Sequence, residues 1–209
     1  MAYPPAIPKE KWAHVAGLYT AGLSMQAVAD TYEVSIGSVT YILRKTTTPR
    51  RSFKEANRIV FENKEPSFVI RKGSSTHRRE MDLIGTALYW AEGYKTSKAM
   101  GVDFANSDPD MAQLFLRFLR TRYVLDPSRL YCQIYYYADQ DIKRITSYWS
   151  KKLNLPLAAF RSPYEKKDPK PHAKKLLYGV VHIRYGDKKL LWDVLNLIRS
   201  CKVKFCVGG

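Results

Sequence analysis

The carboxylate of Glu92 is the first candidate for chemistry in this chain. Apolar spacing predicts a helix over residues 80–92 that ends at Gly93. An acid at the carboxyl end of a helix meets the negative end of the helix dipole, which costs about 0.3–1 kcal/mol. A nearby cation or a bound metal ion would offset that cost; an exposed, solvated Glu92 is the alternative. The next candidate ligands are Asp103, Asp108 and Asp139.

Histidine and cysteine offer little further metal chemistry. The three cysteines, Cys132, Cys201 and Cys206, include no CxxC pair, and their odd number favours a reducing compartment. No two of the four histidines have metal-ligand spacing. The sequence also holds no Ser-His-Asp set and no phosphate-binding loop. Catalysis, if present, therefore depends on carboxylates.

The charge of the chain points to a polyanionic partner. Thirty-five Lys and Arg against 19 Asp and Glu give a net charge of +16, while 45% hydrophobic residues predict a folded protein. Double-stranded DNA is the expected partner, because neutralised phosphates release counterions. An anionic membrane is the rival. Without an apolar run of 18 residues or a signal peptide, we expect no membrane partner and a cytoplasmic, nucleoid-associated protein.

Residues 1–58 are predicted to form an all-α helix-turn-helix domain with a basic arm. A first helix runs from about Pro8 to Gly22, Ser24 caps a second that ends near Tyr32, and Ser35 caps a third over 36–45. The short turn and small apolar residues are typical of a helix-turn-helix, and the segment resembles that of resolvases and invertases. Because Glu33 stands where the turn usually has glycine, we expect a strained backbone there.

The third helix is the expected recognition helix, although a hairpin used for protein contact is the alternative. Its first turns carry short hydroxyl side chains that suit phosphates and base edges, and basic residues at its end suit the DNA backbone. The expected DNA-binding residues here are Ser35, Gly37, Ser38, Thr40, Tyr41, Arg44 and Lys45.

A basic stretch follows this helix. In resolvase-type proteins such an arm lies in the minor groove, so Arg50 and Arg51 are expected to enter a narrow A·T groove. A flexible tether is the alternative. Residues 59–79 look like a linker, with a short strand possible at 67–72.

Residues 80–209 are predicted to form an α+β domain in which one unit recurs three times. Each unit is an apolar strand, an Asp-bearing corner and an amphipathic helix. The corner supplies the helix N-cap, which is Ser107 or Asp108 in the first unit, Asp139 in the second and Asp187 in the third.

The predicted strands alternate, so that one sheet face is apolar and covered by helices. The other face carries Tyr, Gln, His and Arg, on which a duplex could rest; a solvated face is the alternative. The expected DNA contacts on it are Gln133, Tyr135, His182 and Arg184. A basic segment, 161–175, is either a solvated loop or hairpin or a further phosphate contact.

The stretch TALYWAEGY resembles a diverged LAGLIDADG motif, with Ala87 and Ala91 at the small-residue positions and Glu92-Gly93 as the terminal pair. The order of elements over residues 80–200 is similar to that fold, which implies a saddle-like antiparallel sheet. In LAGLIDADG homing endonucleases two such helices pack together and each supplies one acid to shared Mg²⁺ ions. The resemblance therefore implies a homodimer through the Ala87/Ala91 face, with Glu92 as the candidate catalytic residue and Mg²⁺ ligand. Trp90 departs from the family pattern, because it replaces the first acid of the motif.

Two functions follow from these patterns. The favoured one is a sequence-specific double-stranded DNA-binding protein, a non-cleaving or regulatory binder such as the LAGLIDADG family also contains. The alternative is a Mg²⁺-dependent, site-specific homing-type endonuclease. RNA binding through the tyrosine-rich sheet is a third option, and no RNP-like run supports it.

Overall fold

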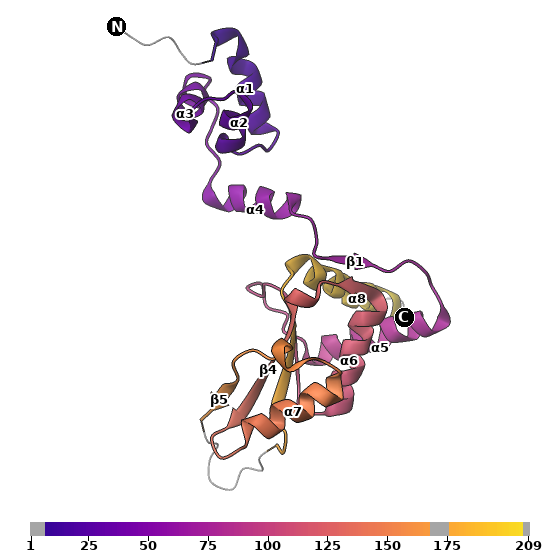
Figure 1. Cartoon of the computed structure of the whole chain (residues 1–209). Coiled ribbons are helices and arrows are strands. Elements are labelled where there is room, and N and C mark those ends of the chain that lie inside the picture. Colours follow the sequence, from indigo (N-terminus) through magenta and orange to yellow (C-terminus); the bar gives the residue numbers. More distant parts are fainter. Residues whose placement is uncertain (1–6, 168–175, 207–209) are drawn as a thin grey trace. The chain divides into compact units, whose positions relative to one another are not determined.

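A computed structural model describes residues 7–167 and 176–206. The chain divides into two compact units, Met1–Glu65 and Pro66–Gly209 (Figure 1). The chain contains both helices and strands, which confirms the predicted α+β class. None of the described helices has the length and apolar character needed to cross a membrane.

The first unit contains the three helices predicted over residues 8–45, followed by a fourth. Its elements are a 3-10 turn, η1 (Lys9–Lys11), and the helices α1 (Trp12–Thr20), α2 (Met25–Thr31), α3 (Ile36–Lys45) and α4 (Phe53–Asn63). Ser24 and Ser35 are the N-caps of α2 and α3, as predicted. Helices α1 to α3 enclose a small core made of Val15, Val28, Ala29, Val39, Ile42 and Leu43.

The turns of this unit use left-handed backbone. Gly22, at φ +117°, lets the chain reverse after α1, a conformation that side chains rarely adopt. Glu33 has φ +51°, which is the strained conformation expected in the turn before α3.

The segment 59–79 contains regular secondary structure, including a strand within the predicted range 67–72. Helix α4 continues to Asn63, the strand β1 (Phe68–Ile70) follows, and helix α5 (Thr76–Glu92) begins before Glu80. Strand β1 pairs antiparallel with β3 (Tyr123–Leu125), and the Phe68 ring packs edge-on against the Tyr123 ring. One inward-facing aromatic residue thus anchors a stretch whose composition is mostly polar.

Hydrogen bonds add to this anchor. Both the backbone N–H and the hydroxyl of Ser67 donate to Asp187 Oδ2, at 2.8 and 2.7 Å. The Tyr185 hydroxyl donates to the Ser67 carbonyl at 2.6 Å. Residue 67 is therefore joined to the end of the main sheet, 118 positions later in the chain.

The second unit contains the three predicted strand-helix repeats, β2–α6, β4–α7 and β6–α8. Its remaining elements are β2 (Val102–Asn106), α6 (Pro109–Arg122), η2 (Pro127–Arg129), β4 (Leu130–Tyr137), α7 (Ile142–Leu153), η3 (Leu157–Ala159), β5 (Tyr164–Lys166), β6 (Val180–Tyr185) and α8 (Lys188–Cys206). Asp108 caps α6, and the Asp187 carboxylate accepts from the first turn of α8, as predicted. Asp141, and not Asp139, caps α7, because the turn after β4 is two residues longer than predicted.

The main sheet has the strand order β2-β6-β4-β5. Strands β2, β6 and β4 are antiparallel, but β5 pairs parallel to β4, so the sheet is mixed and not the fully antiparallel sheet expected. Strand β5 lies within the basic segment 161–175. Residues 168–175 of that segment fall outside the described residues.

Helices cover one face of the sheet, and Figure 1 shows α6 and α7 on the same side of β4. Strand residues buried beneath them are Val102, Phe104, Cys132, Ile134, Val181 and Ile183. Gly85 of α5 lies against the Phe118 ring of α6, so closely that an added Cβ would be 2.0 Å from the ring. This contact sets the distance between α5 and α6. The opposite side of α5 faces away from α6 and is exposed.

Candidate nucleic-acid interface

The outward side of α3 carries the residues expected of a recognition helix. Gly37, Tyr41, Arg44 and Lys45 are all exposed, and their helical spacing places them on one side. The opposite side is buried through Val39, Ile42 and Leu43. Helix α3 is therefore fixed in the unit by its apolar side and presents a basic, aromatic side outward.

The hydroxyl groups near the start of α3 are partly used by the helix itself. Ser35 Oγ accepts from the Ser38 N–H and lies 3.1 Å from Ser38 Oγ. Thr40 Oγ1 donates to the Ile36 carbonyl at 2.9 Å. Because the Thr40 hydroxyl already donates to the helix, it offers acceptor lone pairs to an outside partner, whereas either hydroxyl of the Ser35–Ser38 contact can be the donor.

Tyr41 lies at the centre of the exposed surface. Its ring meets the Trp12 ring edge-on at 5.9 Å. The Arg44 guanidinium and the Lys45 ammonium lie 5.8 and 5.7 Å from the same ring centroid, within cation–π range. Two cations are thus held beside an aromatic ring, an arrangement that suits phosphates together with base edges or thymine methyls.

Arg51 is part of the folded unit, which corrects its prediction as a groove-binding arm. Its guanidinium donates to the carbonyls of Tyr19, Gly22 and Leu23, and it stacks over the Tyr19 ring at 4.0 Å. These carbonyls lie at the end of α1, where helix C=O groups need donors. Arg50 is exposed, so it alone of the predicted pair keeps its charge open to a DNA backbone.

The four residues predicted on the polar sheet face do come together. Arg184 of β6 reaches Gln133 Oε1 and the Tyr135 hydroxyl on β4, at 2.5 and 3.4 Å. The His182 ring stacks on the Tyr135 ring, with 4.1 Å between centroids. Side chains from two neighbouring strands thus form one network on the sheet face that the helices leave uncovered.

The sequence did not predict that an acid, Asp103, joins this network as the partner of Arg184 and His182. Asp103 of β2 accepts from Arg184 Nε at 2.8 Å and pairs with His182 Nδ1 at 2.9 Å. Burial alone would raise the pKa of Asp103, but the hydrogen bond and charge of His182 and the charge of Arg184 lower it. The Arg184 charge is consequently paired within the protein, and contact of this residue with DNA stays a prediction.

Further aromatic and basic residues extend this surface. Tyr164 of β5 lies 4.8 Å from the Tyr135 ring, and Lys166 lies 5.7 Å from it. The Arg161 guanidinium lies 3.5 Å from the centroid of the Tyr131 ring. Sequence reasoning placed Arg161, Tyr164 and Lys166 in a loop or hairpin, because the three-residue β5 has no alternating pattern long enough to detect.

Glu92 is exposed at the last position of α5, as predicted. The Lys95 ammonium donates to the Gly93 carbonyl at 2.6 Å and the Tyr89 carbonyl at 3.4 Å, so this lysine neutralises part of the negative end of the helix. Among the described residues no three His, Cys, Asp or Glu side chains come together as a metal site.

The outer side of α5 is apolar. Ala87 and Ala91 are exposed on it, together with Leu83, Ile84 and Trp90. The bulky Tyr89 points the other way, stacks on Phe115, and has its pKa raised to about 12 by burial. The small residues thus lie where a second helix could approach closely, on the side away from the core.

This chain matches no family model, no curated protein and no solved structure. Its charge distribution adds to the geometry. Residues 1–65 hold nine Lys and Arg against six acids, or +3, whereas residues 66–209 hold 26 against 13, or +13. Most of the attraction for a polyanion therefore resides in the second unit, and the helix-turn-helix contributes little net charge.

Proposed function

We propose that this chain is a sequence-specific double-stranded DNA-binding protein that acts by binding, as a regulator of transcription, and not by cleavage. The observation that carries the proposal is the exposed side of α3, where Tyr41, Arg44 and Lys45 form one surface on a helix-turn-helix. A second helix of this motif that presents such residues fits the major groove.

The second unit supplies non-specific affinity in this proposal. Its +13 charge favours contact with phosphates, and the sheet face with Gln133, Tyr135 and His182 lies uncovered by helices. The exposed Ala87/Ala91 side of α5 is the proposed homodimer contact. A DNA-bound protein of this kind would reside in the cytoplasm, on the nucleoid.

Fluorescence anisotropy with labelled duplexes tests the division of roles. Lys45→Ala should weaken binding to all duplexes alike and flatten the plot of log affinity against log salt by about one. A duplex of random sequence should bind with the same salt dependence but more weakly than a selected site. Equal affinity for every duplex would contradict sequence-specific binding.

A Mg²⁺-dependent homing-type endonuclease is the second candidate. The observation that favours it is the exposure of Glu92 at the end of α5, beside the apolar side of that helix. Two copies joined through Ala87 and Ala91 would bring two such acids together. Bound Mg²⁺ would supply Lewis-acid activation of water, and Glu92 would hold the ion.

A further inference from the structure

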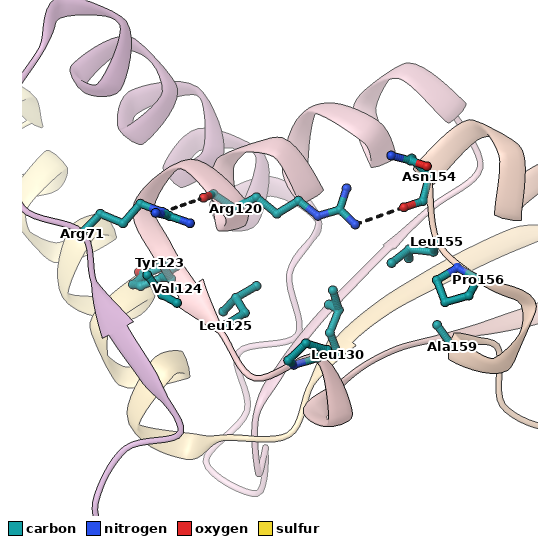
Figure 2. Close-up of a pocket in the computed structure, with 11 residues that line it drawn as sticks. Arg71, Arg120, Tyr123, Val124, Leu125, Leu130, Asn154, Leu155, Pro156 and Ala159 are labelled. Carbon is teal, nitrogen blue, oxygen red and sulfur yellow. Dashed lines mark hydrogen bonds between the residues drawn. The ribbon is translucent and has the colours of Figure 1, made fainter.

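A hollow of about 370 Å³ lies between β3, the start of β4 and the segment that follows α7. Figure 2 shows its lining, which is mainly apolar and includes Val124, Leu125, Leu130, Leu155, Pro156 and Ala159. This volume is within the range of small-molecule pockets, which are apolar with a few polar groups that fix orientation. Neither the recognition helix nor the uncovered sheet face includes these residues.

Two arginines lie along one side of the hollow (Figure 2). Arg71 Nε donates to the Arg120 carbonyl at 3.2 Å, and this is the only hydrogen bond that its guanidinium makes within residues 7–167 and 176–206. The Arg120 guanidinium donates to the carbonyls of Leu153 and Asn154, at 3.3 and 3.2 Å. Both are exposed on their outer side.

Neither arginine has an acidic partner among the residues that the structure describes. The nearest acid along the lining segments, Asp126, is paired with Arg129 and accepts from Ser128. The two guanidinium groups, beside an unfilled apolar surface, thus lack the counter-charge that guanidinium groups normally meet. An anion with an apolar body would satisfy both features at once.

We propose that this hollow binds a small amphipathic carboxylate. Its apolar tail would lie against Val124, Leu125 and Leu155, where water is displaced from apolar surface. Its carboxylate would accept two parallel hydrogen bonds from the Nη groups of Arg71, with Arg120 adding positive charge. The site is independent of DNA binding, so either proposal can fail without the other.

Titration with octanoate, followed by methyl NMR of the full chain, tests the proposal. The methyl signals of Val124, Leu125 and Leu155 should shift together and saturate, while those of the helix-turn-helix should not move. Arg71→Ala should weaken this binding about tenfold or more, because it removes the paired hydrogen bonds. Arg117→Ala is the matched control, since Arg117 is exposed on α6 and does not line the hollow; it should leave the affinity unchanged.

Two further probes separate the parts of the site. Octanamide has the same tail without the charge and should bind at least tenfold more weakly. Inorganic phosphate has charge without a tail and should not shift the apolar methyls. The proposal is overturned if octanoate shifts signals over the whole surface, if Arg71→Ala and Arg117→Ala lose affinity equally, or if octanamide binds as well as octanoate.

Discussion

Arg184 Nε lies 2.8 Å from Asp103 Oδ2 across the strands β6 and β2, in the middle of the uncovered sheet face. These residues are direct partners in the antiparallel register. The pair neutralises the one arginine on the outward side of β6, and it fixes the position of Gln133 and His182 beside it. The sheet face is therefore an ordered polar surface and not an array of free cations.

Asp103→Asn should lower the free energy of unfolding by about 1–3 kcal/mol at pH 7, because it leaves the Arg184 charge without its partner. Urea denaturation of the full chain measures the change. Glu80→Gln is the control, since Glu80 is an exposed carboxylate on α5. Equal loss in both variants would show that the Asp103–Arg184 pair contributes nothing beyond net charge.

The same pair predicts a pH dependence. The pKa of Asp103 is lowered in the folded chain, so its stabilisation is present above its unfolded pKa near 4 and is lost as pH falls through the folded pKa. The stability difference between wild type and Asp103→Asn should therefore shrink as pH falls below about 4. A difference that stays constant down to pH 2 would contradict this assignment.

Alanine substitutions at Arg51 and Arg50 should have different effects, one on stability and the other on DNA affinity. Arg51→Ala removes donors from the end of α1 and should destabilise the first unit by about 1–3 kcal/mol, with little change in the salt dependence of DNA binding. Arg50→Ala should do the reverse and reduce the salt slope by about one. Thermal unfolding and anisotropy on both variants measure the two effects, and a salt slope altered by Arg51→Ala alone would restore the arm interpretation.

Gly85→Ala should destabilise the second unit by about 1–3 kcal/mol, because the new methyl would overlap the Phe118 ring. Gly17→Ala is the matched control. Gly17 is exposed in α1 with nothing within 4 Å of an added Cβ, so alanine there should stabilise by up to about 1 kcal/mol. If both substitutions raise the unfolding temperature, α5 and α6 are not in close contact.

Glu92→Gln distinguishes the two candidate functions. If the chain cuts duplexes with Mg²⁺, this variant should lose cutting and keep DNA affinity nearly intact, because an amide ligates the ion poorly. Glu80→Gln on the same helix should keep both. Incubation of a genomic-fragment library with each protein and Mg²⁺ measures cutting and retention, and efficient cutting by Glu92→Gln would exclude Glu92 as the metal ligand.

Local patterns predicted the parts of the fold that depend on local chemistry. The caps at Ser24 and Ser35, the left-handed Glu33 and the alternation of β4 each involve residues a few positions apart. They follow from hydrogen-bond geometry and side-chain period, which are properties of short segments.

Long-range pairings were the parts that the sequence did not reveal. The Asp103–Arg184 pair depends on strand register across 81 positions, and β1 depends on its pairing with β3 and on the contact between Phe68 and Tyr123. The three carbonyls that hold Arg51 lie 28 to 32 positions earlier. Composition made this arginine look like part of an arm, because a charge count does not distinguish a capping residue from a solvated one.

Selection from a randomised duplex library tests the central proposal most directly. The wild-type chain should enrich one sequence motif, and Tyr41→Ala/Arg44→Ala should enrich a different or degenerate motif, because these side chains lie on the exposed side of α3. Arg199→Ala/Lys204→Ala, which removes two exposed charges from α8, should weaken binding without changing the motif. Two results would contradict DNA reading by α3. In the first, the wild type enriches no motif; in the second, the Tyr41→Ala/Arg44→Ala variant enriches the same motif with the same ranking.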